Sequence, residues 1–240
     1  MHRPFSHSPT PALSARPVIV CFSHLRWDLV FQRPQHIMTR LAGQFDVTYW
    51  EEARFEAACD SPRLDRSSVE GGVTRLVPVL PEGLDGTAID RALGALLEAE
   101  VAGHRGPLVF WYYTPMMLAF SAGMQPDFTV YDCMDELANF AFAPADIAQR
   151  EASLMARADL VLCGGRSLYE ARRNRHPNVN CYPSGVDIAH FAREAATTPE
   201  PEDQAQLPRP RLGFYGVIDE RMDLALLAEL NRDYVRANIT

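Results

Sequence analysis

Three carboxylates stand close together in the segment YDCMDE: Asp132, Asp135 and Glu136. Crowded carboxylates raise one another's pKa, and a carboxylate with a raised pKa can accept the proton of an attacking hydroxyl group. Asp132 and Asp135 are therefore the candidate catalytic residues. Their DxxD spacing differs from the DxD of a metal-binding pair, and no metal ligand is assigned. The alternative for Asp135 is structural, because aspartate often caps the first turn of a helix.

A second candidate site follows the apolar segment 211–218, where Gly216, Asp219 and Arg221 stand close together. A glycine lets the backbone approach a phosphate group, and the N-terminus of the following helix offers free N–H groups with a positive dipole. Arg221 can add a bidentate pair of hydrogen bonds to a diphosphate and stabilise a leaving nucleotide. The alternative is structural, since Asp219 and Glu220 are acidic residues of the kind favoured at the start of a helix.

Polar and aromatic residues follow the first apolar run: His24, Arg26 and Trp27, with Arg33 at the start of the next helical pattern. The ring of Trp27 can stack on the C–H side of a sugar, and packing under the loop is the alternative. Arg33 opposes the helix dipole, so we expect it to have a carboxylate or phosphate partner. These four residues and Tyr113, at the end of another apolar run, are the candidate substrate-binding residues.

The composition excludes several kinds of chemistry. All 23 basic residues are arginine, so the chain cannot form a P-loop, a Schiff-base site or a protein-kinase site, each of which needs a lysine. The formal net charge of −8 argues against a nucleic-acid partner, which usually requires a basic excess. Five scattered cysteines form no CxxC pair, and this pattern suits a reducing compartment.

Apolar runs and helical patterns alternate along the chain, and they must position these residues. The pattern predicts strands over residues 17–23, 45–50, 73–80, 108–113, 128–136, 159–165, 179–187 and 211–218. It predicts helices over 32–44, 86–103, from about 115, 144–159, 167–176 and 219–230. Such alternation is typical of an α/β fold with a Rossmann-like parallel sheet covered on both faces. Ligands of these sheets bind at the carboxyl ends of the strands.

The most membrane-like segment is the 17-residue stretch 108–124, which contains Pro115. It is at the short limit for crossing a bilayer. We expect it to form a strand and then a short helix in a protein core.

Four segments, taken in order, carry a resemblance to a known family. They are RWDLVFQRPQHIMTRLA (26–42), YDCMDELANF (131–140), YPSGVDIAHF (182–191) and PRLGFYGVIDERMDLALL (210–227). Together they resemble the bacterial glycosyltransferases of family 4, which have the GT-B fold. The resemblance is to the branch with a tryptophan and Gln-Arg-Pro near the N-terminus. The histidine that assists catalysis in many members has no counterpart in WYYTPMM (111–117).

The resemblance implies two Rossmann-like domains, the N-terminal one for the acceptor and the C-terminal one for a nucleotide-diphosphate sugar. On that plan residues 17–190 are the acceptor domain and 211–240 the start of the donor domain. Composition predicts a disordered tail over residues 1–16, which are rich in Ser, Pro and His, and a proline-rich, acidic linker over 191–210. The family's pair of glutamates separated by seven residues is not found after residue 211. The expectation is therefore an incomplete donor domain and little activity of this chain alone.

The resemblance further implies a retaining transferase that moves a sugar to a polysaccharide or glycolipid acceptor in the cytoplasm. The nucleotide-diphosphate sugar is a co-substrate, and no other cofactor is expected. A lipid-linked acceptor would bring the protein into peripheral contact with the inner face of the membrane. Two alternatives stay open: a non-catalytic module that binds an acceptor or partner, and a fragment of a GT-B sugar-nucleotide epimerase.

Overall fold

The computed structural model describes residues 15–192, 198–207, 211 and 222–235 of the chain. The chain divides into two compact units, unit 1 over Met1–Gly185 and unit 2 over Val186–Thr240, and each is described by itself. Unit 1 contains the strands β1 Val18–Phe22, β2 Asp46–Trp50, β3 Arg54–Glu56, β4 Arg63–Ser68, β5 Thr74–Pro81, β6 Leu108–Tyr112, β7 Phe128–Cys133, β8 Leu160–Cys163 and β9 Val179–Cys181. Its helices are α1 Arg33–Leu41, α2 Gly86–Val101, α3 Leu118–Ser121, α4 Ile147–Arg157 and α5 Arg166–Arg172. The predicted domain boundaries at 190/191 and 210/211 stay predictions.

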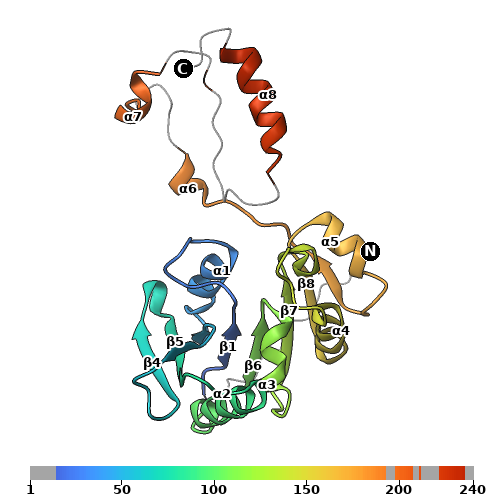
Figure 1. The fold of residues 1–240 in the computed structure, drawn as a ribbon. Coiled ribbons are helices and arrows are strands. Elements are labelled where there is room, and N and C mark those ends of the chain that lie inside the picture. Colours follow the sequence, from blue (N-terminus) through green and yellow to red (C-terminus); the bar gives the residue numbers. More distant parts are fainter. Residues whose placement is uncertain (1–14, 193–197, 208–210, 212–221, 236–240) are drawn as a thin grey trace, which may run out of the picture. The chain divides into compact units, whose positions relative to one another are not determined.

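The strands of unit 1 form one sheet in the order β3-β5-β2-β1-β6-β7-β8-β9, with β4 paired to β5 (Figure 1). Every neighbouring pair is parallel except β4 with β5. The chain places β1 near the middle of the sheet and crosses from β5 to β6 through α2. The predicted α/β fold with a Rossmann-like parallel sheet is thus confirmed.

The central strand β1 shows why this sequence folds as a covered sheet. Its five residues are all buried, and successive side chains point to opposite faces. Val18, Val20 and Phe22 pack with residues of α2 and α4 in one core cluster, whereas Ile19 and Cys21 pack with α1 in another. Helix α1 therefore covers one face of the sheet and α2 and α4 cover the other. Each fully buried aliphatic or aromatic side chain contributes about 1.5–3 kcal/mol.

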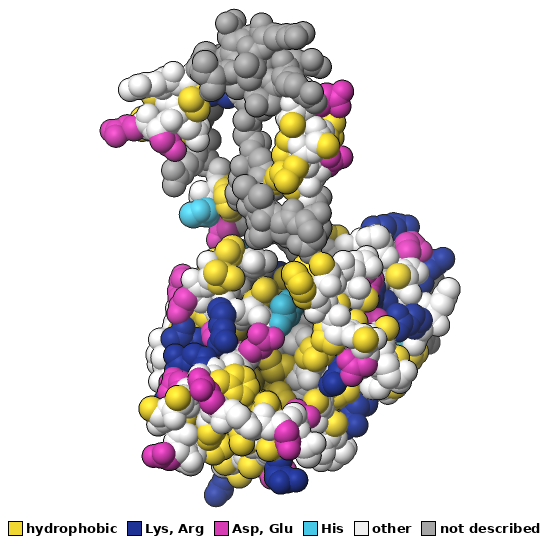
Figure 2. All heavy atoms as spheres, in the orientation of Figure 1, with side chains coloured by type: hydrophobic (Ala, Val, Ile, Leu, Met, Phe, Trp, Pro, Cys, Tyr) yellow, Lys and Arg dark blue, Asp and Glu magenta, His cyan; other side chains and the backbone are white. Residues whose placement is uncertain are grey.

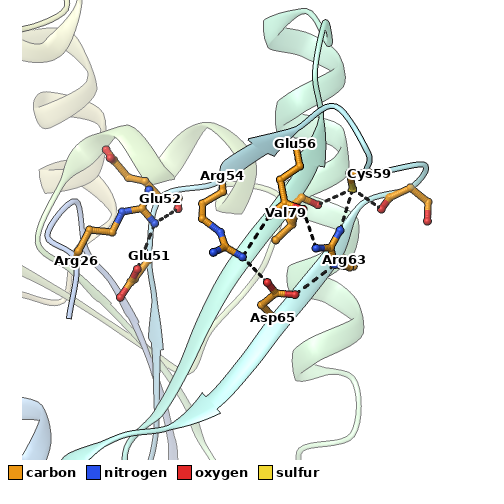
Figure 3. Close-up of polar contacts among 10 residues, drawn as sticks. Arg26, Glu51, Glu52, Arg54, Glu56, Cys59, Arg63, Asp65 and Val79 are labelled. Atoms are coloured by element: carbon orange, nitrogen blue, oxygen red, sulfur yellow. Dashed lines mark hydrogen bonds and ion pairs between the residues drawn. The ribbon is translucent and has the colours of Figure 1, made fainter. Parts of the chain in front are cut away.

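The strands β3 and β4 are absent from the sequence prediction. The sequence of β4 is RLDRSS, without the alternating apolar residues that identify a half-buried strand. It lies at the edge of the sheet, where ion pairs replace apolar packing: Arg54 binds Asp65, and Arg63 binds Glu56 and Asp65 (Figure 3). Exposed charges of this kind protect a sheet edge against pairing with another chain.

The apolar stretch 108–124 folds as expected, into a strand and a short helix. Strand β6 ends at Tyr112, a single helical turn covers Pro115–Met117, and α3 follows. The Tyr112 hydroxyl and Ser121 Oγ lie 2.8 Å apart and are both buried. Among the described residues, no helix has the length and apolar character that crossing a membrane requires.

Unit 2 contains three described helices, α6 Ile188–Phe191, α7 Glu202–Ala205 and α8 Leu224–Val235. Helix α8 begins after Asp223, whose carboxylate accepts a hydrogen bond from the Leu226 N–H at 2.9 Å. The predicted helix over 219–230 therefore starts later than expected among the described residues, because Asp223 caps it. The predicted strand over 211–218 lies outside the described residues except for Arg211.

Two adjacent glycines next to α1 give a first testable prediction. Gly71 and Gly72 have φ angles of 75° and 79°, but only at Gly71 would a Cβ meet a neighbour, 2.7 Å from Thr39 Cβ. We expect Gly71→Ala to lower the free energy of unfolding by about 2–4 kcal/mol, from backbone strain and overpacking together. The control Gly72→Ala adds strain alone and should cost about 1–2 kcal/mol in urea unfolding. Equal losses for the two variants would contradict the predicted clash.

Candidate active site

The predicted site residues of unit 1 come together at the carboxyl edge of three neighbouring strands. Phe22 of β1 pairs with Tyr112 of β6, which in turn pairs with Tyr131 of β7. His24, Tyr113 and Asp132 lie one or two residues beyond these partners and so share one edge of the sheet. This is the edge at which open α/β sheets bind ligands.

Asp132 is fully buried and paired with Arg33 from the first turn of α1. Arg33 Nε lies 3.0 and 3.1 Å from the two carboxylate oxygens, and Arg33 Nη2 lies 3.0 Å from Oδ1. The third guanidinium nitrogen, Nη1, donates to the Tyr182 carbonyl oxygen at 2.7 Å. The expected carboxylate partner of Arg33 is therefore Asp132, which offsets the unfavourable helix dipole. The same pair ties α1 to β7 and to the segment after β9.

The surroundings of Asp132 act on its pKa in opposite directions. Burial raises the pKa of Asp132, and the Arg33 guanidinium, the Tyr113 hydroxyl and the Trp111 indole lower it, with a net upward shift. The Tyr113 hydroxyl and Trp111 Nε1 are themselves buried and have no hydrogen-bond partner of normal geometry among the described residues. Asp132 is thus enclosed by Arg33 and by two further donors, and its side chain is 0% exposed. In this arrangement it supports the site and does not face solvent.

Asp135 lies two residues beyond the end of β7 and is partly exposed. The helical turn that follows, Leu137–Asn139, begins after Glu136 without a side-chain cap, so the helix-cap alternative for Asp135 is wrong. The carboxylate of Asp135 accepts no hydrogen bond from the described residues, and its charge raises the pKa of His24. Of the two predicted catalytic carboxylates, Asp135 is the one accessible to a ligand.

Glu136 belongs instead to a buried ion network that the sequence did not predict. Arg172 of α5 is 1% exposed, and its Nη2 lies 2.9 Å from Glu136 Oε1 and 2.6 Å from Glu151 Oε1. Tyr131 and Arg175 also donate to Glu151, at 2.9 and 3.1 Å. The network holds the loop that contains Asp135 and Glu136 against α4 and α5.

Arg26 is held by two consecutive glutamates after β2. Its Nη1 lies 3.2 Å from Glu51 Oε2 and 2.9 Å from the Glu52 carbonyl oxygen (Figure 3). The other carboxylate oxygen of Glu51 accepts the Trp27 N–H at 2.8 Å. Glu51, buried at 3% exposure, was missed from sequence; its signal is a carboxylate directly after a buried strand.

The stacking role predicted for Trp27 is corrected by the structure. The ring is 6% exposed and meets Tyr49 edge to face, with centroids 4.9 Å apart. Trp27 packs beneath the loop, which is the alternative that the sequence left open, because the apolar face of α1 needs a large partner there. Tyr113 is also buried, at 1%, and burial raises the pKa of its hydroxyl well above the ordinary value. Neither side chain presents a surface to solvent.

The loop between β1 and α1 is shaped by a glutamine that sequence reasoning overlooked. Gln35 is fully buried, accepts the Gln32 N–H at 3.0 Å, and donates to the carbonyl oxygens of Trp27 and Val30 at 3.1 and 2.9 Å. The Gln-x-x-Gln spacing at the start of a helix is the signal of this capping box. Hydrophobic side chains of the same loop are exposed, and Figure 2 shows yellow side chains at the end of unit 1 that carries α1. The exposed hydrophobic residues of this loop are Leu29, Val30 and Phe31.

His24 follows β1 and is partly buried. Burial lowers its pKa, and the charge of Asp135 opposes that shift; the net change is downward. Its Nδ1 is buried and makes no hydrogen bond with the described residues. His24 is therefore a neutral imidazole near pH 7, beside the accessible carboxylate.

The predicted phosphate-binding residues Gly216, Asp219 and Arg221 lie outside the described residues. Within the described part of the chain, no group of three histidine, cysteine or acidic residues is placed to hold a metal ion.

The comparisons with known proteins concern the fold. No protein-family model and no curated protein matches the sequence. A structure described as OtsA in its apo form is 12% identical, with a TM-score of 0.52, over 79% of this chain and 54% of that one. A trehalose-6-phosphate synthase, OtsA, is 13% identical, with a TM-score of 0.50, over 80% of this chain and 54% of that one. A sucrose-phosphate synthase from Thermosynechococcus elongatus is 10% identical, with a TM-score of 0.50, over 73% of this chain and 50% of that one. The chain spans about half the length of these synthases and shares the α/β Rossmann-like fold of that half.

Proposed function

We propose that this chain is part of a GT-B glycosyltransferase, related to family 4, that moves a sugar from a nucleotide diphosphate to a polysaccharide or glycolipid acceptor. The observation that carries the proposal is the meeting of His24, Asp132 and Asp135 at the carboxyl edge of three adjacent parallel strands. The likeness in fold to two kinds of sugar-phosphate synthase supports it. We place the reaction in the cytoplasm, with peripheral membrane contact where the acceptor is lipid-linked.

In the proposed reaction the acceptor binds at this edge of unit 1, with a hydroxyl group near Asp135. The acceptor oxygen forms a bond to the anomeric carbon of the donor sugar, and the bond from that carbon to the diphosphate oxygen breaks. The hydroxyl proton passes to the Asp135 carboxylate, and the nucleoside diphosphate leaves. We assign the diphosphate to Gly216, Asp219 and Arg221, and the reaction retains the anomeric configuration.

A transfer assay on the complete transferase, of which we propose that this chain is a part, tests this proposal. Labelled nucleotide-diphosphate sugars are offered with a panel of oligosaccharide acceptors, and both released nucleotide and labelled product are measured. We expect acceptor-dependent release, lowered at least about 100-fold by Asp135→Asn because a positioned proton acceptor is removed. The matched control is Asp60→Asn, an exposed carboxylate between β3 and β4, which should leave the rate unchanged. Absence of transfer with every donor and acceptor, or equal rates for the two variants, would contradict the proposed roles.

A further inference from the structure

We propose that the carboxyl edge of unit 1 selects an uncharged sugar as the acceptor and disfavours a sugar phosphate. This inference rests on the proposed function and adds the class of acceptor. It comes from the charges at the edge, where the loop cations Arg26 and Arg33 carry carboxylate partners, the carboxylate of Asp135 is accessible, and the exposed cation Arg166 is paired within its own helix.

In the first cation, Arg33, all three guanidinium nitrogens already bond protein oxygens. Two of its nitrogens are committed to Asp132 and the third to the Tyr182 carbonyl oxygen. Its side chain is 7% exposed, and that of Asp132 is 0% exposed. A phosphate that took hydrogen bonds from Arg33 would leave the Asp132 carboxylate buried without its cation, which is strongly unfavourable.

The second cation, Arg26, also has a carboxylate partner, but its side chain is 39% exposed and only its Nη1 is bonded within the described residues. Its Nη1 is shared between Glu51 and the Glu52 carbonyl oxygen, and the Glu51 carboxylate also holds the Trp27 N–H. The Glu51 side chain is 4% exposed, so the carboxylate of this ion pair is buried. A ligand that took over Nη1 would leave the buried Glu51 carboxylate without its cation and would disturb the loop before α1.

The groups that remain accessible are suited to hydroxyl groups. The Asp135 carboxylate accepts no hydrogen bond from the described residues and can accept one from a sugar hydroxyl. His24, with its lowered pKa, is neutral and offers an imidazole to the same ligand. A phosphate dianion at this place would meet a like charge at Asp135 with no unpaired cation among these side chains.

Arg166 is a more exposed cation at this edge than Arg26 or Arg33. Its side chain is 83% exposed, and its partner Glu170 lies 3.2 Å away, one turn later in α5. An exposed pair within one helix is weak and can be exchanged for another anion. Arg166 is therefore the residue at which a phosphate would be detected if our inference is wrong.

Matched probes test the inference on the full chain: glucose, galactose and mannose, each beside its 6-phosphate, and inorganic phosphate alone. Binding is followed by ¹H–¹⁵N NMR at residues 24–33 and 132–136. We expect at least one neutral sugar to shift these signals, its 6-phosphate to bind at least tenfold more weakly, and inorganic phosphate to shift none. Asp135→Asn should weaken binding of the neutral sugar at least fivefold, and the control Asp60→Asn should leave that binding unchanged.

A second variant keeps the inference open to refutation if all sugars bind weakly. Asp135→Arg replaces the accessible anion by a cation without a buried partner, and it should raise the affinity for glucose 6-phosphate at least tenfold. The inference would be overturned if the unaltered chain bound a sugar 6-phosphate more tightly than the neutral sugar at this edge. It would also be overturned if the 6-phosphate bound at Arg166 and this binding were lost in Arg166→Gln. The absence of shifts with every neutral sugar would overturn it as well.

These outcomes differ from those that bear on the proposed function. Binding of a sugar phosphate at the edge overturns the selectivity and leaves sugar transfer intact. Absence of transfer from any nucleotide donor contradicts the proposed function and leaves a measured preference for neutral sugars standing.

Discussion

Replacement of Arg172 by methionine should lower the free energy of unfolding of unit 1 by about 3–5 kcal/mol. Arg172 is 1% exposed and pairs with both Glu136 and Glu151. Its loss leaves the largely buried Glu151 carboxylate with Tyr131 and Arg175 as its partners among the described residues. Urea unfolding followed by tryptophan fluorescence measures the loss, because all three tryptophans belong to unit 1.

The matched control for Arg172 is the next residue. Arg173 is 51% exposed and pairs with Glu170 on the surface of α5. We expect Arg173→Met to cost no more than about 0.5 kcal/mol. Similar losses for the two methionine variants would show that the buried network contributes little to stability.

The same network predicts how pH affects the difference in stability between the unaltered chain and Arg172→Met. Burial alone would raise the pKa of Glu151, but hydrogen bonds from Arg172 and Tyr131 outweigh it, and the pKa is lowered. An acid whose pKa is lowered by folding adds stability above its unfolded pKa of about 4.3, and this is lost as the pH falls through the folded value. The gap between the unaltered chain and Arg172→Met should therefore narrow below pH ~4. A constant gap from pH 7 to pH 3 would contradict the assigned charge on Glu151.

Arg33→Met should have an effect of the same size, about 3–5 kcal/mol, for the same physical reason. The substitution leaves Asp132, at 0% exposure, without its cation and removes the hydrogen bond to the Tyr182 carbonyl oxygen. Urea unfolding at pH 7 gives the loss. Arg91→Met, at an exposed position of α2, should stay within about 0.5 kcal/mol of the unaltered chain.

A double variant separates the buried pair from the rest of the site. Arg33→Met with Asp132→Leu removes both charges, so we expect it to be more stable than Arg33→Met alone by about 1–3 kcal/mol. Strictly additive losses would mean that the two side chains do not interact in the folded protein. Recovery of stability without recovery of sugar transfer would show that the pair also serves the reaction.

The sheet could be predicted from sequence where burial leaves a clear pattern. The runs that form β1, β2 and β6 are apolar and β-branched or aromatic because both of their faces are covered. By contrast, β4 contains two arginines and an aspartate because it lies at the edge of the sheet, and its strand conformation leaves no apolar signal. Its existence depends on pairing with β5, which is a tertiary contact.

The candidate site could be located from the sequence, but the contacts between its side chains could not be predicted. Asp132 stands inside an apolar run, and a buried charge requires a partner, so a cation near it is a physical necessity. That the cation is Arg33, 99 residues earlier, follows only from the crossover that places β7 two strands from β1. For the same reason the burial of Trp27 depends on Tyr49 of β2, which its own sequence neighbours do not reveal.

The position of β1 in the sheet has a consequence for synthesis of the chain. Val18 pairs on one side with Asp46 and on the other with Leu108. The 62 residues from Val47 through Leu108 take about 3–12 s to translate at roughly 5–20 residues per second. During that interval the β6-facing edge of an apolar strand is unpaired on the nascent chain. We therefore expect the growing polypeptide to need chaperone protection until β6 has left the ribosome.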